Sequence, residues 1–329
     1  MVTARGLITE ELLGLLGQAP AAARGSVGSI TSGQADGVDA LSDEDLQLAL
    51  YLCYELHYQG LPGVSDDWEW APELVRIRRE LERRFEAALL ENWPRPEAGV
   101  DVRSALMEMA HGGTSTPSLS AHMAAEGTLD QMRELCIHRS AYQLKEADPH
   151  TWGIPRLTGQ AKAAMVEIQM DEYGSGRRGG MHSVLFGETM DALGLDASYG
   201  FYLDRIPGST LATVNLVSML GLHRKRRAAL VGHLALFEMS SVGPMSRYSE
   251  CLKRLGVEPR ARRFYDVHVE ADARHEKVAL DRMVNGLLDE EPECGPDIVL
   301  GARWLTGLEA RFSRRVMACW SEGICSLYQ

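Results

Sequence analysis

The chain has 329 residues, 45% hydrophobic and 24% charged, which is enough for a large buried core in one or two domains. Its 46 acidic and 34 basic residues give a net charge of −12, which argues against general nucleic-acid binding and favours small-molecule or protein partners. Six scattered cysteines contain no CxxC pair, so we expect free thiols in a reducing interior.

The first 40 residues are expected to be a flexible or irregular arm. Residues 20–40 are rich in Gly, Ser and Ala and have no apolar period. Glu10 and Glu11 interrupt the apolar run that a signal peptide would need. No later stretch reaches the roughly 20 apolar residues that cross a bilayer. We therefore expect a soluble, cytoplasmic protein with no membrane partner.

Helical periodicity then continues to the C-terminus, and no convincing alternating strand interrupts it. This pattern predicts an all-α fold without internal repeats. We assign residues 41–150 to N-terminal helices that pack on a helical bundle formed by 151–329, with 41–329 as one compact unit. The expected helices include 41–60, 71–93, 156–174, 181–195, 209–221, 225–242, 245–256, 259–288 and 295–323.

The most informative helix carries two histidines and an aspartate on one side. His268, Asp272 and His275 are spaced by four and three residues. At about 100° per residue they fall within a stripe about 60° wide, so all three can face one point. Glu270 and Glu276 lie off the stripe and mark the outer face. A solvated helix whose histidines have no function is the alternative, and one helix does not decide between the two.

Glu238 is the most unusual single residue, because it lies in an otherwise almost wholly apolar helical segment. An ionised carboxylate is costly there unless it is paired or bound to a metal. A buried arginine partner is the alternative explanation. His233 lies five residues earlier and points elsewhere, so we interpret it as a core or surface histidine.

A third segment supplies another carboxylate and another imidazole. Glu172 ends one predicted helix and His182 begins the next, and the glycine-rich loop between them can turn both toward one centre. Glu167 and Asp171 are rival carboxylates. Glu167 is an additional or alternative ligand, although it could instead pair with an arginine of the loop.

Taken together, these segments offer three carboxylates and three histidines. A metal centre in a bundle needs ligands from several helices, and these come from three. Mixed imidazole and carboxylate ligands without cysteine suit iron, with manganese as the alternative. Six side chains suit two ions with a bridging carboxylate. The predicted ligands are Glu172, His182, Glu238, His268, Asp272 and His275.

The order of these residues resembles the haem-oxygenase-like diiron oxidases, a family often labelled iron-containing redox enzymes. The shared pattern is a Glu with a His ten positions later, a lone Glu on the next core helix, and His-x3-Asp-x2-His. It covers about residues 155–280. The resemblance implies a haem-oxygenase-like bundle of about seven core helices with extra N-terminal helices, in which these six residues hold two irons that react with O2.

The resemblance also implies a choice of reactions on a small-molecule substrate. Members oxidise amine nitrogens to hydroxylamine or nitro groups, or they cleave or desaturate carboxylic acids, often in natural-product biosynthesis. We expect an amino-acid-like substrate oxidised at its amine. Oxidative C–C cleavage or desaturation of an amino or fatty acid is the alternative. Electrons are expected from a reductase or a chemical reductant, and a homodimer is compatible with the sequence.

Three arginines in segments that flank the ligands are candidates for binding a substrate carboxylate: Arg177, Arg178 and Arg205. Surface solubility is the other explanation for them.

Two function classes compete with the diiron interpretation. A haem-degrading or cofactor-free enzyme of the same fold could use His57 as the haem ligand, but this leaves Glu238 and His268 unexplained. A non-catalytic helical interaction protein would use the acids and histidines only on helix surfaces.

Overall fold

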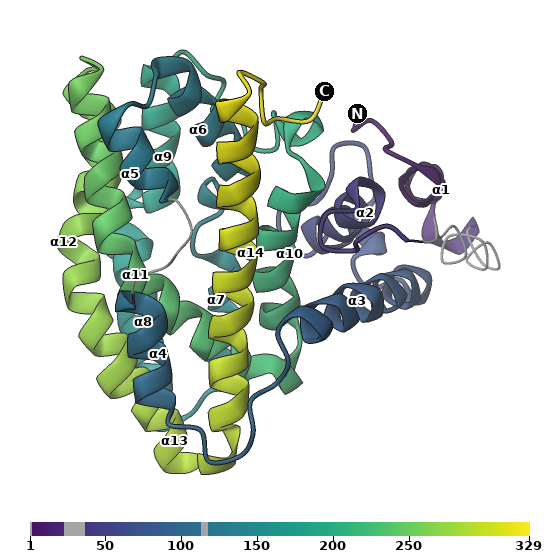
Figure 1. Cartoon of the computed structure of the whole chain (residues 1–329). Helices are drawn as coiled ribbons and strands as arrows, with labels where there is room; N and C mark the ends of the chain where they lie inside the picture. The colour runs from purple at the N-terminus through teal and green to yellow at the C-terminus, as the bar shows by residue number, and fades with distance from the viewer. Residues whose placement is uncertain (1, 23–36, 113–117) are drawn as a thin grey trace.

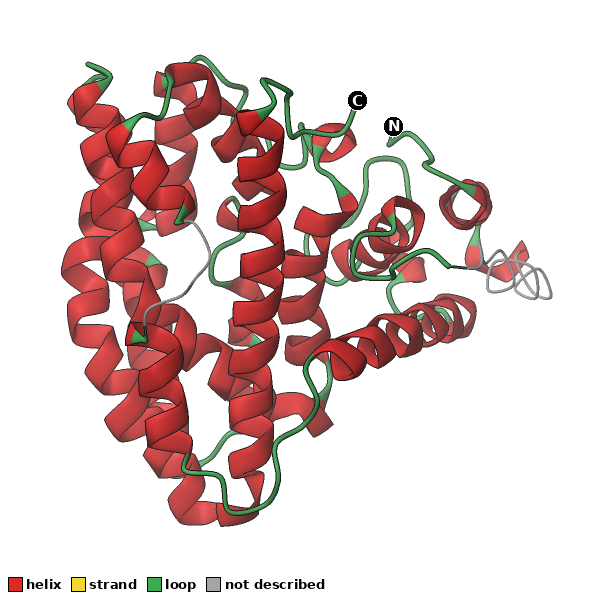
Figure 2. Cartoon of the chain, in the orientation of Figure 1, coloured by secondary structure: helices red, strands yellow, loops and turns green. Residues whose placement is uncertain are grey.

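The computed structural model describes residues 2–22, 37–112 and 118–329, which form helices joined by short connections (Figure 2). Within these ranges no strand is present, and the one isolated backbone bridge pairs Tyr173 with Met181. The all-α prediction is therefore confirmed. No helix within these ranges is long and apolar enough to cross a membrane.

The helices are arranged as a bundle with a smaller group of N-terminal helices beside it (Figure 1). A π-helix, Val278–Val284, continues α12. The α-helices are α1 (Leu7–Leu16), α2 (Glu44–Glu55), α3 (Pro72–Asn92), α4 (Val102–His111), α5 (Leu119–Ala125), α6 (Leu129–Gln143), α7 (Asp148–Thr151), α8 (Gly159–Glu172), α9 (His182–Ala192), α10 (Gly208–Leu222), α11 (Arg227–Arg254), α12 (Arg263–Lys277), α13 (Asn285–Glu290) and α14 (Gly295–Ser321).

The first helix, α1, departs from the irregular arm expected over the first 40 residues. Asp45, in the first turn of α2, accepts hydrogen bonds from the backbone N–H groups of Ile8 and Thr9 at 2.8 and 2.7 Å. These N–H groups have no partner within their own helix, so Asp45 satisfies them from outside. The expectation is wrong for this helix. The part of the predicted arm over 23–36 lies outside the described residues.

Helix α10 links the N-terminal helices to the bundle. It packs against α2 and also against α14 and α7. Because neighbours surround it, 13 of its 15 residues are buried, which explains its nearly continuous apolar sequence. Its buried amide nitrogen is satisfied: Asn215 Nδ2 donates to the backbone carbonyl and to the side-chain oxygen of Gln47, both at 2.8 Å.

Helix α11 runs through the bundle as a single element of 28 residues, where two helices separated near Pro244 were expected. Proline removes one backbone N–H from a helix interior. Helix α11 nevertheless packs against α4, α5, α12 and α14, and tertiary packing of this kind supplies most helical stability. The hydroxyl of Ser240 donates to the carbonyl of Leu236 at 2.7 Å, in the turn before the proline.

Helix α12 lies against α11, and α9 also contacts it. Its buried residues form one stripe, and its outer face is charged. The π-helix that follows has four buried apolar residues and packs on α8 and α11. A π-turn changes the helical phase, and such turns are frequent at functional sites. Helix α11 therefore lies along α12, and α8 packs on the π-helix that continues α12.

Candidate metal centre

The predicted stripe on α12 faces inward. His268, Asp272 and His275 have 2%, 2% and 1% of their surface exposed. Glu270 is exposed, and Glu276 accepts a hydrogen bond from His111 at the surface. The charged outer face and the inward stripe are therefore distinct, and the solvated-helix alternative does not describe the three ligand candidates.

Seven buried side chains gather into two groups of four that share one carboxylate. Within each group, one ligand atom from each residue lies within 4.8 Å of the others. All six predicted ligands are among the seven, and their role as iron ligands stays a prediction. The first group is Glu146, Glu172, His182 and His268, and the second is Glu172, Glu238, Asp272 and His275.

A glycine-rich turn brings Glu172 and His182 together. The backbone bridge between Tyr173 and Met181 closes the loop directly inside these two residues. Gly174 has a φ of 63°, and a Cβ on it would lie 2.3 Å from the carbonyl carbon of Gly180. Only glycine fits both the left-handed backbone and this contact. The result is a distance of 2.6 Å between His182 Nδ1 and Glu172 Oε2.

Glu238 has a partner other than the arginine considered as an alternative. Its carboxylate is 4% exposed, and Oε2 lies 3.0 Å from Nδ1 of His275 on α12. Among the described residues, no Lys or Arg forms an ion pair with it. The carboxylate on the apolar helix therefore belongs to the second group.

Sequence reasoning missed Glu146, which lies just after α6. It is 3% exposed, and its Oε1 lies 3.6 Å from Nε2 of His268. The Gln143 amide, oriented so that its nitrogen donates, lies 2.8 and 2.9 Å from the two carboxylate oxygens of Glu146. The available signal was the spacing of Arg139, Gln143 and Glu146, which repeats the four-then-three stripe of α12.

Three buried atoms test whether these residues fit a metal. Glu172 Oε2, His182 Nδ1 and His268 Nε2 have no hydrogen-bond partner among the described residues. Buried polar atoms of this kind are rare in folded proteins and call for an explanation such as a bound ion. All three belong to the first group. Imidazole nitrogens and carboxylate oxygens without a thiolate form a donor set that suits iron or manganese.

Among the described residues, the buried carboxylates of the cluster have only histidine protons as positive charge beside them. Burial raises the pKa values of Glu172 and Asp272 to about 7 each. Burial alone would lower the pKa of His268, but nearby carboxylates, chiefly Glu146, raise it to about 10. Burial likewise opposes the charge of His275, whose pKa is raised to about 9, mainly by Glu238. Protons on these histidines supply positive charge that metal cations would supply instead.

An outer layer of hydrogen bonds fixes the orientation of the ligands. The backbone carbonyl of Phe264 lies 2.8 Å from Nδ1 of His268, which leaves Nε2 to face the first group. Asp171, one of the rival carboxylates, instead lies 3.0 Å from Nε2 of His275. Ser241 donates to Oδ2 of Asp272 at 2.5 Å. Such partners are typical of metal sites, where they set the tautomer and the orientation of the ligands.

A cavity of ≈ 350 Å³ lies against this cluster, between α6, α11, α12 and α14. Gln143, Ser241 and Phe264 line it, and each also contacts one of the ligands. One wall of the cavity is therefore the outer layer of the metal centre. A small molecule bound in the cavity would lie next to the cluster and would be partly shielded from water.

The remaining predicted site residues lie elsewhere. Glu167 is 48% exposed and pairs with Arg282 at 2.5 Å, so it is not an alternative ligand. Arg177, Arg178 and Arg205 are exposed, and none of them lines the cavity. Their proposed contact with a substrate carboxylate is therefore not supported. The arginine that does line the cavity is Arg139 of α6.

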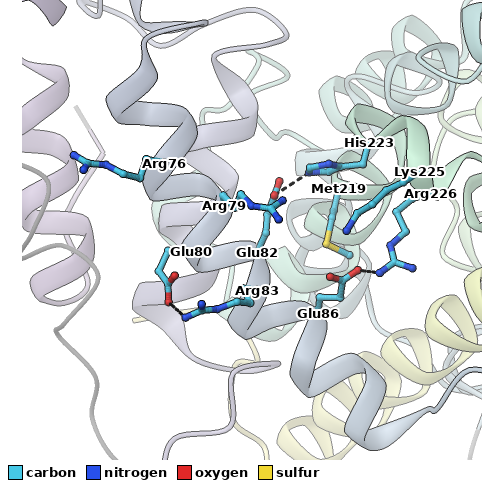
Figure 3. Close-up of a pocket in the computed structure, with 10 residues that line it drawn as sticks. All are labelled: Arg76, Arg79, Glu80, Glu82, Arg83, Glu86, Met219, His223, Lys225 and Arg226. Atoms are coloured by element: carbon cyan, nitrogen blue, oxygen red, sulfur yellow. Dashed lines mark hydrogen bonds and ion pairs between the residues drawn. The ribbon is translucent and has the colours of Figure 1, made fainter.

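Two other features are separate from the cluster. His57 contacts Glu69 and Arg78 among the N-terminal helices and belongs to neither group of ligands. A second hollow between α3 and the α10–α11 connection is lined mainly by charged side chains (Figure 3). Each of its three acids has a local partner, in the pairs Glu80–Arg83, Glu82–His223 and Glu86–Arg226.

Comparison with known proteins agrees with this geometry. The model of a family described as iron-containing redox enzymes matches residues 133–310, a span that contains all seven cluster residues. A nitrosourea synthase from Streptomyces achromogenes subsp. streptozoticus is 24% identical over 196 residues, or 59% of this chain. The matched part is 42% of that relative, so the chain spans less than half of the relative's length.

Proposed function

The chain belongs to the iron-containing redox enzymes, and from this membership we propose that it is an O2-activating non-haem diiron oxygenase. Its proposed substrate is a small amino-acid-like metabolite, oxidised at an amine nitrogen in natural-product biosynthesis. The observation that carries the proposal is the sharing of Glu172 by two buried groups of four ligands. As a member of a redox-enzyme family, the chain is an oxidoreductase, and the alternative of a non-catalytic interaction protein does not hold.

The two groups support a set of four ligands for each iron, with Glu172 common to both sets. One iron would be held by Glu146, Glu172, His182 and His268, and the other by Glu172, Glu238, Asp272 and His275. Four ligands on each ion leave coordination positions open for exchange. Ferrous ions bound there would supply the site at which O2 is reduced.

The balance of the reaction requires a reductant. Hydroxylation of an amine converts R–NH2, O2, two electrons and two protons into R–NHOH and water. One N–H bond is replaced by N–OH, and the second oxygen atom leaves as water. The electrons come from an external donor, a reductase or a chemical reductant. A nitro product requires further oxidation of the same nitrogen.

The protein side chains position the ligands and exclude water. Gln143 and Ser241 hold the carboxylates of Glu146 and Asp272 in place. Phe186 and Phe264 pack edge to face with ring centroids 5.1 Å apart, and both line the cavity. Apolar walls of this kind keep competing water from a reactive centre.

The nitrosourea synthase supports nitrogen as the oxidised atom, because its name describes a product with an oxidised nitrogen. Since this chain spans less than half of that relative, the relative's complete activity is not carried over. Oxidative C–C cleavage and desaturation use the same ligands and are distinguished by their products.

The test is turnover by the anaerobically iron-loaded full chain, with candidate amino acids, a reductant and then O2. We expect substrate-dependent O2 consumption and a product heavier by one oxygen atom on nitrogen, identified by mass spectrometry. A product lighter by two hydrogens would indicate desaturation in place of N-oxygenation, and release of CO2 would indicate oxidative C–C cleavage. Absence of O2 consumption with every substrate and reductant would contradict the oxygenase proposal. The same measurements on manganese-loaded protein show whether the activity requires iron.

A further inference from the structure

We propose that the cavity binds a free α-amino acid by its head group, with the carboxylate on Arg139 and the ammonium on Glu309, so that the side chain of the amino acid points at the metal centre. This inference rests on the proposed function, because it names the substrate class of the same site. It also predicts which atom is oxidised: one in the side chain, and not the α-nitrogen.

Two parts of the cavity lining differ in chemistry. Gln143, Ser241 and Phe264 line the cavity and contact the ligands. An ion pair between Arg139 of α6 and Glu309 of α14 also lines it. Arg139 is four residues before Gln143, hence about 6 Å from it along the axis of α6. A molecule of this length that contacts both parts of the lining has one end at the ion pair and the other near the cluster.

The ion pair has two parallel hydrogen bonds and is only partly buried, and both of its members line the cavity. The Nη1 and Nη2 atoms of Arg139 donate to the two carboxylate oxygens of Glu309 at 2.8 and 2.7 Å. The guanidinium carbon lies 4.3 Å from the centroid of the Phe312 ring, which supports its plane. The two side chains keep 26% and 30% of their surface accessible. Both charges are thus held in place and available to a ligand.

The chemistry of the pair favours a zwitterion. A guanidinium binds a carboxylate with two parallel hydrogen bonds, and a carboxylate binds an ammonium group. An α-amino acid carries both groups on one carbon, so it can give each member of the pair a new partner of opposite charge. A simple amine or a simple fatty acid would satisfy only one member and leave the other charge unpaired, which is costly in a half-buried site.

The size and the walls of the cavity restrict the rest of the ligand. Its volume of ≈ 350 Å³ is near the lower end of the usual range for ligand pockets, roughly 300–1000 Å³. This volume suits one amino acid better than a peptide or a long acyl chain. Tyr142, Phe237 and Tyr248 also line it, and they offer apolar contact to an extended side chain with a few hydroxyl groups along it.

The test is calorimetric titration of the full chain, both metal-free and loaded with iron(II) under argon, with each standard L-amino acid and with ornithine. For the tightest ligand, its methyl ester and its decarboxylated amine are titrated as well. We expect one or more free amino acids to bind, and the ester and the amine to bind at least about tenfold more weakly. Equal binding of all three forms, or no binding by any amino acid, would overturn the proposal.

Variants separate recognition from a purely structural ion pair. Arg139→Gln and Glu309→Gln should each weaken binding at least about tenfold. The charge-swapped double variant R139E/E309R keeps an ion pair, so it should melt near the wild-type temperature. It exchanges the positions that hold the carboxylate and the ammonium group, and with the side chain directed at the cluster this arrangement fits the D-enantiomer, so the L-amino acid should bind at least about tenfold more weakly. Arg95→Gln, which breaks the exposed pair with Asp297, is the matched control and should bind normally. Wild-type affinity in the charge-swapped variant would also overturn the proposal.

Failure of the proposed function gives a different pattern. If the amino acid binds with this dependence on Arg139 and Glu309 but no O2 is consumed, the oxygenase proposal fails and the recognition proposal stands. If O2 is consumed with a substrate that lacks the amino-acid head group, the recognition proposal alone fails.

Discussion

Oε2 of Glu172 and Nδ1 of His182 lie 2.6 Å apart although a loop of nine residues separates them in the chain. Neither atom has a hydrogen-bond partner among the residues that the structure describes. Two buried acceptors at this distance repel each other unless a proton or a cation lies between them. The loop therefore holds these two ligands where a shared metal ion would satisfy both.

The glycine at the start of this loop should control metal binding. Gly174→Ala combines a left-handed backbone with a contact of 2.3 Å to the Gly180 carbonyl carbon, so it should destabilise the fold by about 1–3 kcal/mol and weaken metal binding. Gly176→Ala is the matched control, because Gly176 also has a positive φ but open space around its Cβ position. Thermal melting with and without iron checks both variants. Equal metal affinity in the two would contradict this account of the loop.

Glu146 should be needed for one metal ion and not for the other. It belongs to the first group only, so Glu146→Gln should lower the iron content from about two ions per chain to about one. The control is Glu270→Gln, on the exposed face of α12, which should retain both ions. Iron is counted after anaerobic loading and gel filtration. A Glu146→Gln variant that retains both ions would remove Glu146 from the ligand set.

The Ser241 hydroxyl should act on the metal through Asp272. Removing its hydrogen bond in Ser241→Ala should reduce the affinity of the second group roughly 10–100-fold, the usual effect of losing such a partner. Ser240→Ala removes a hydroxyl that donates to the carbonyl of Leu236 and touches no ligand, so it should leave the affinity unchanged. Competition with a chelator measures both. The idea fails if the two variants are indistinguishable.

Metal binding should strengthen as the pH rises from 6 to 9. In the metal-free protein the pKa values of His268 and His275 are raised to about 10 and 9, so both hold protons at neutral pH that a metal must displace. Raised pKa values also mean that these protons stabilise the metal-free fold at low pH and that this stability is lost as the pH rises toward 9 and 10. The increase in melting temperature on adding iron(II) or manganese(II) should therefore grow with pH. A metal-induced increase in melting temperature that stays constant or decreases as the pH rises would contradict this prediction.

The sequence was sufficient for the parts of the site that follow from helical geometry. The spacing of His268, Asp272 and His275 determines their common face, and an acid in an apolar helix must find a buried partner, as Glu238 does. The all-α class followed from the same periodicity. These inferences depend only on local geometry and on the cost of burying charge.

Other features of the fold and the site depend on contacts between distant parts of the chain, which the periodicity of the sequence does not reveal. Glu146 lies just beyond α6 and continues the spacing of Arg139 and Gln143, but this spacing does not say what the residue faces, and only the packing of α6 on the bundle brings it to His268. Helix α1 is capped by Asp45 from another helix, and α11 continues through Pro244 because its neighbours hold it. Arg139 was overlooked for the same reason, since its partner Glu309 is 170 residues away. The division of the chain near residue 150 stays a prediction, although the cluster draws Glu146 from the earlier part.

Two iron ions that share Glu172 would be seen directly by anomalous X-ray diffraction at the iron edge, on crystals of the full chain loaded with ferrous iron under argon. We expect two anomalous peaks, one between Glu146, Glu172, His182 and His268, and one between Glu172, Glu238, Asp272 and His275. A single peak bound without Glu172, or no peak within this cluster, would contradict this expectation.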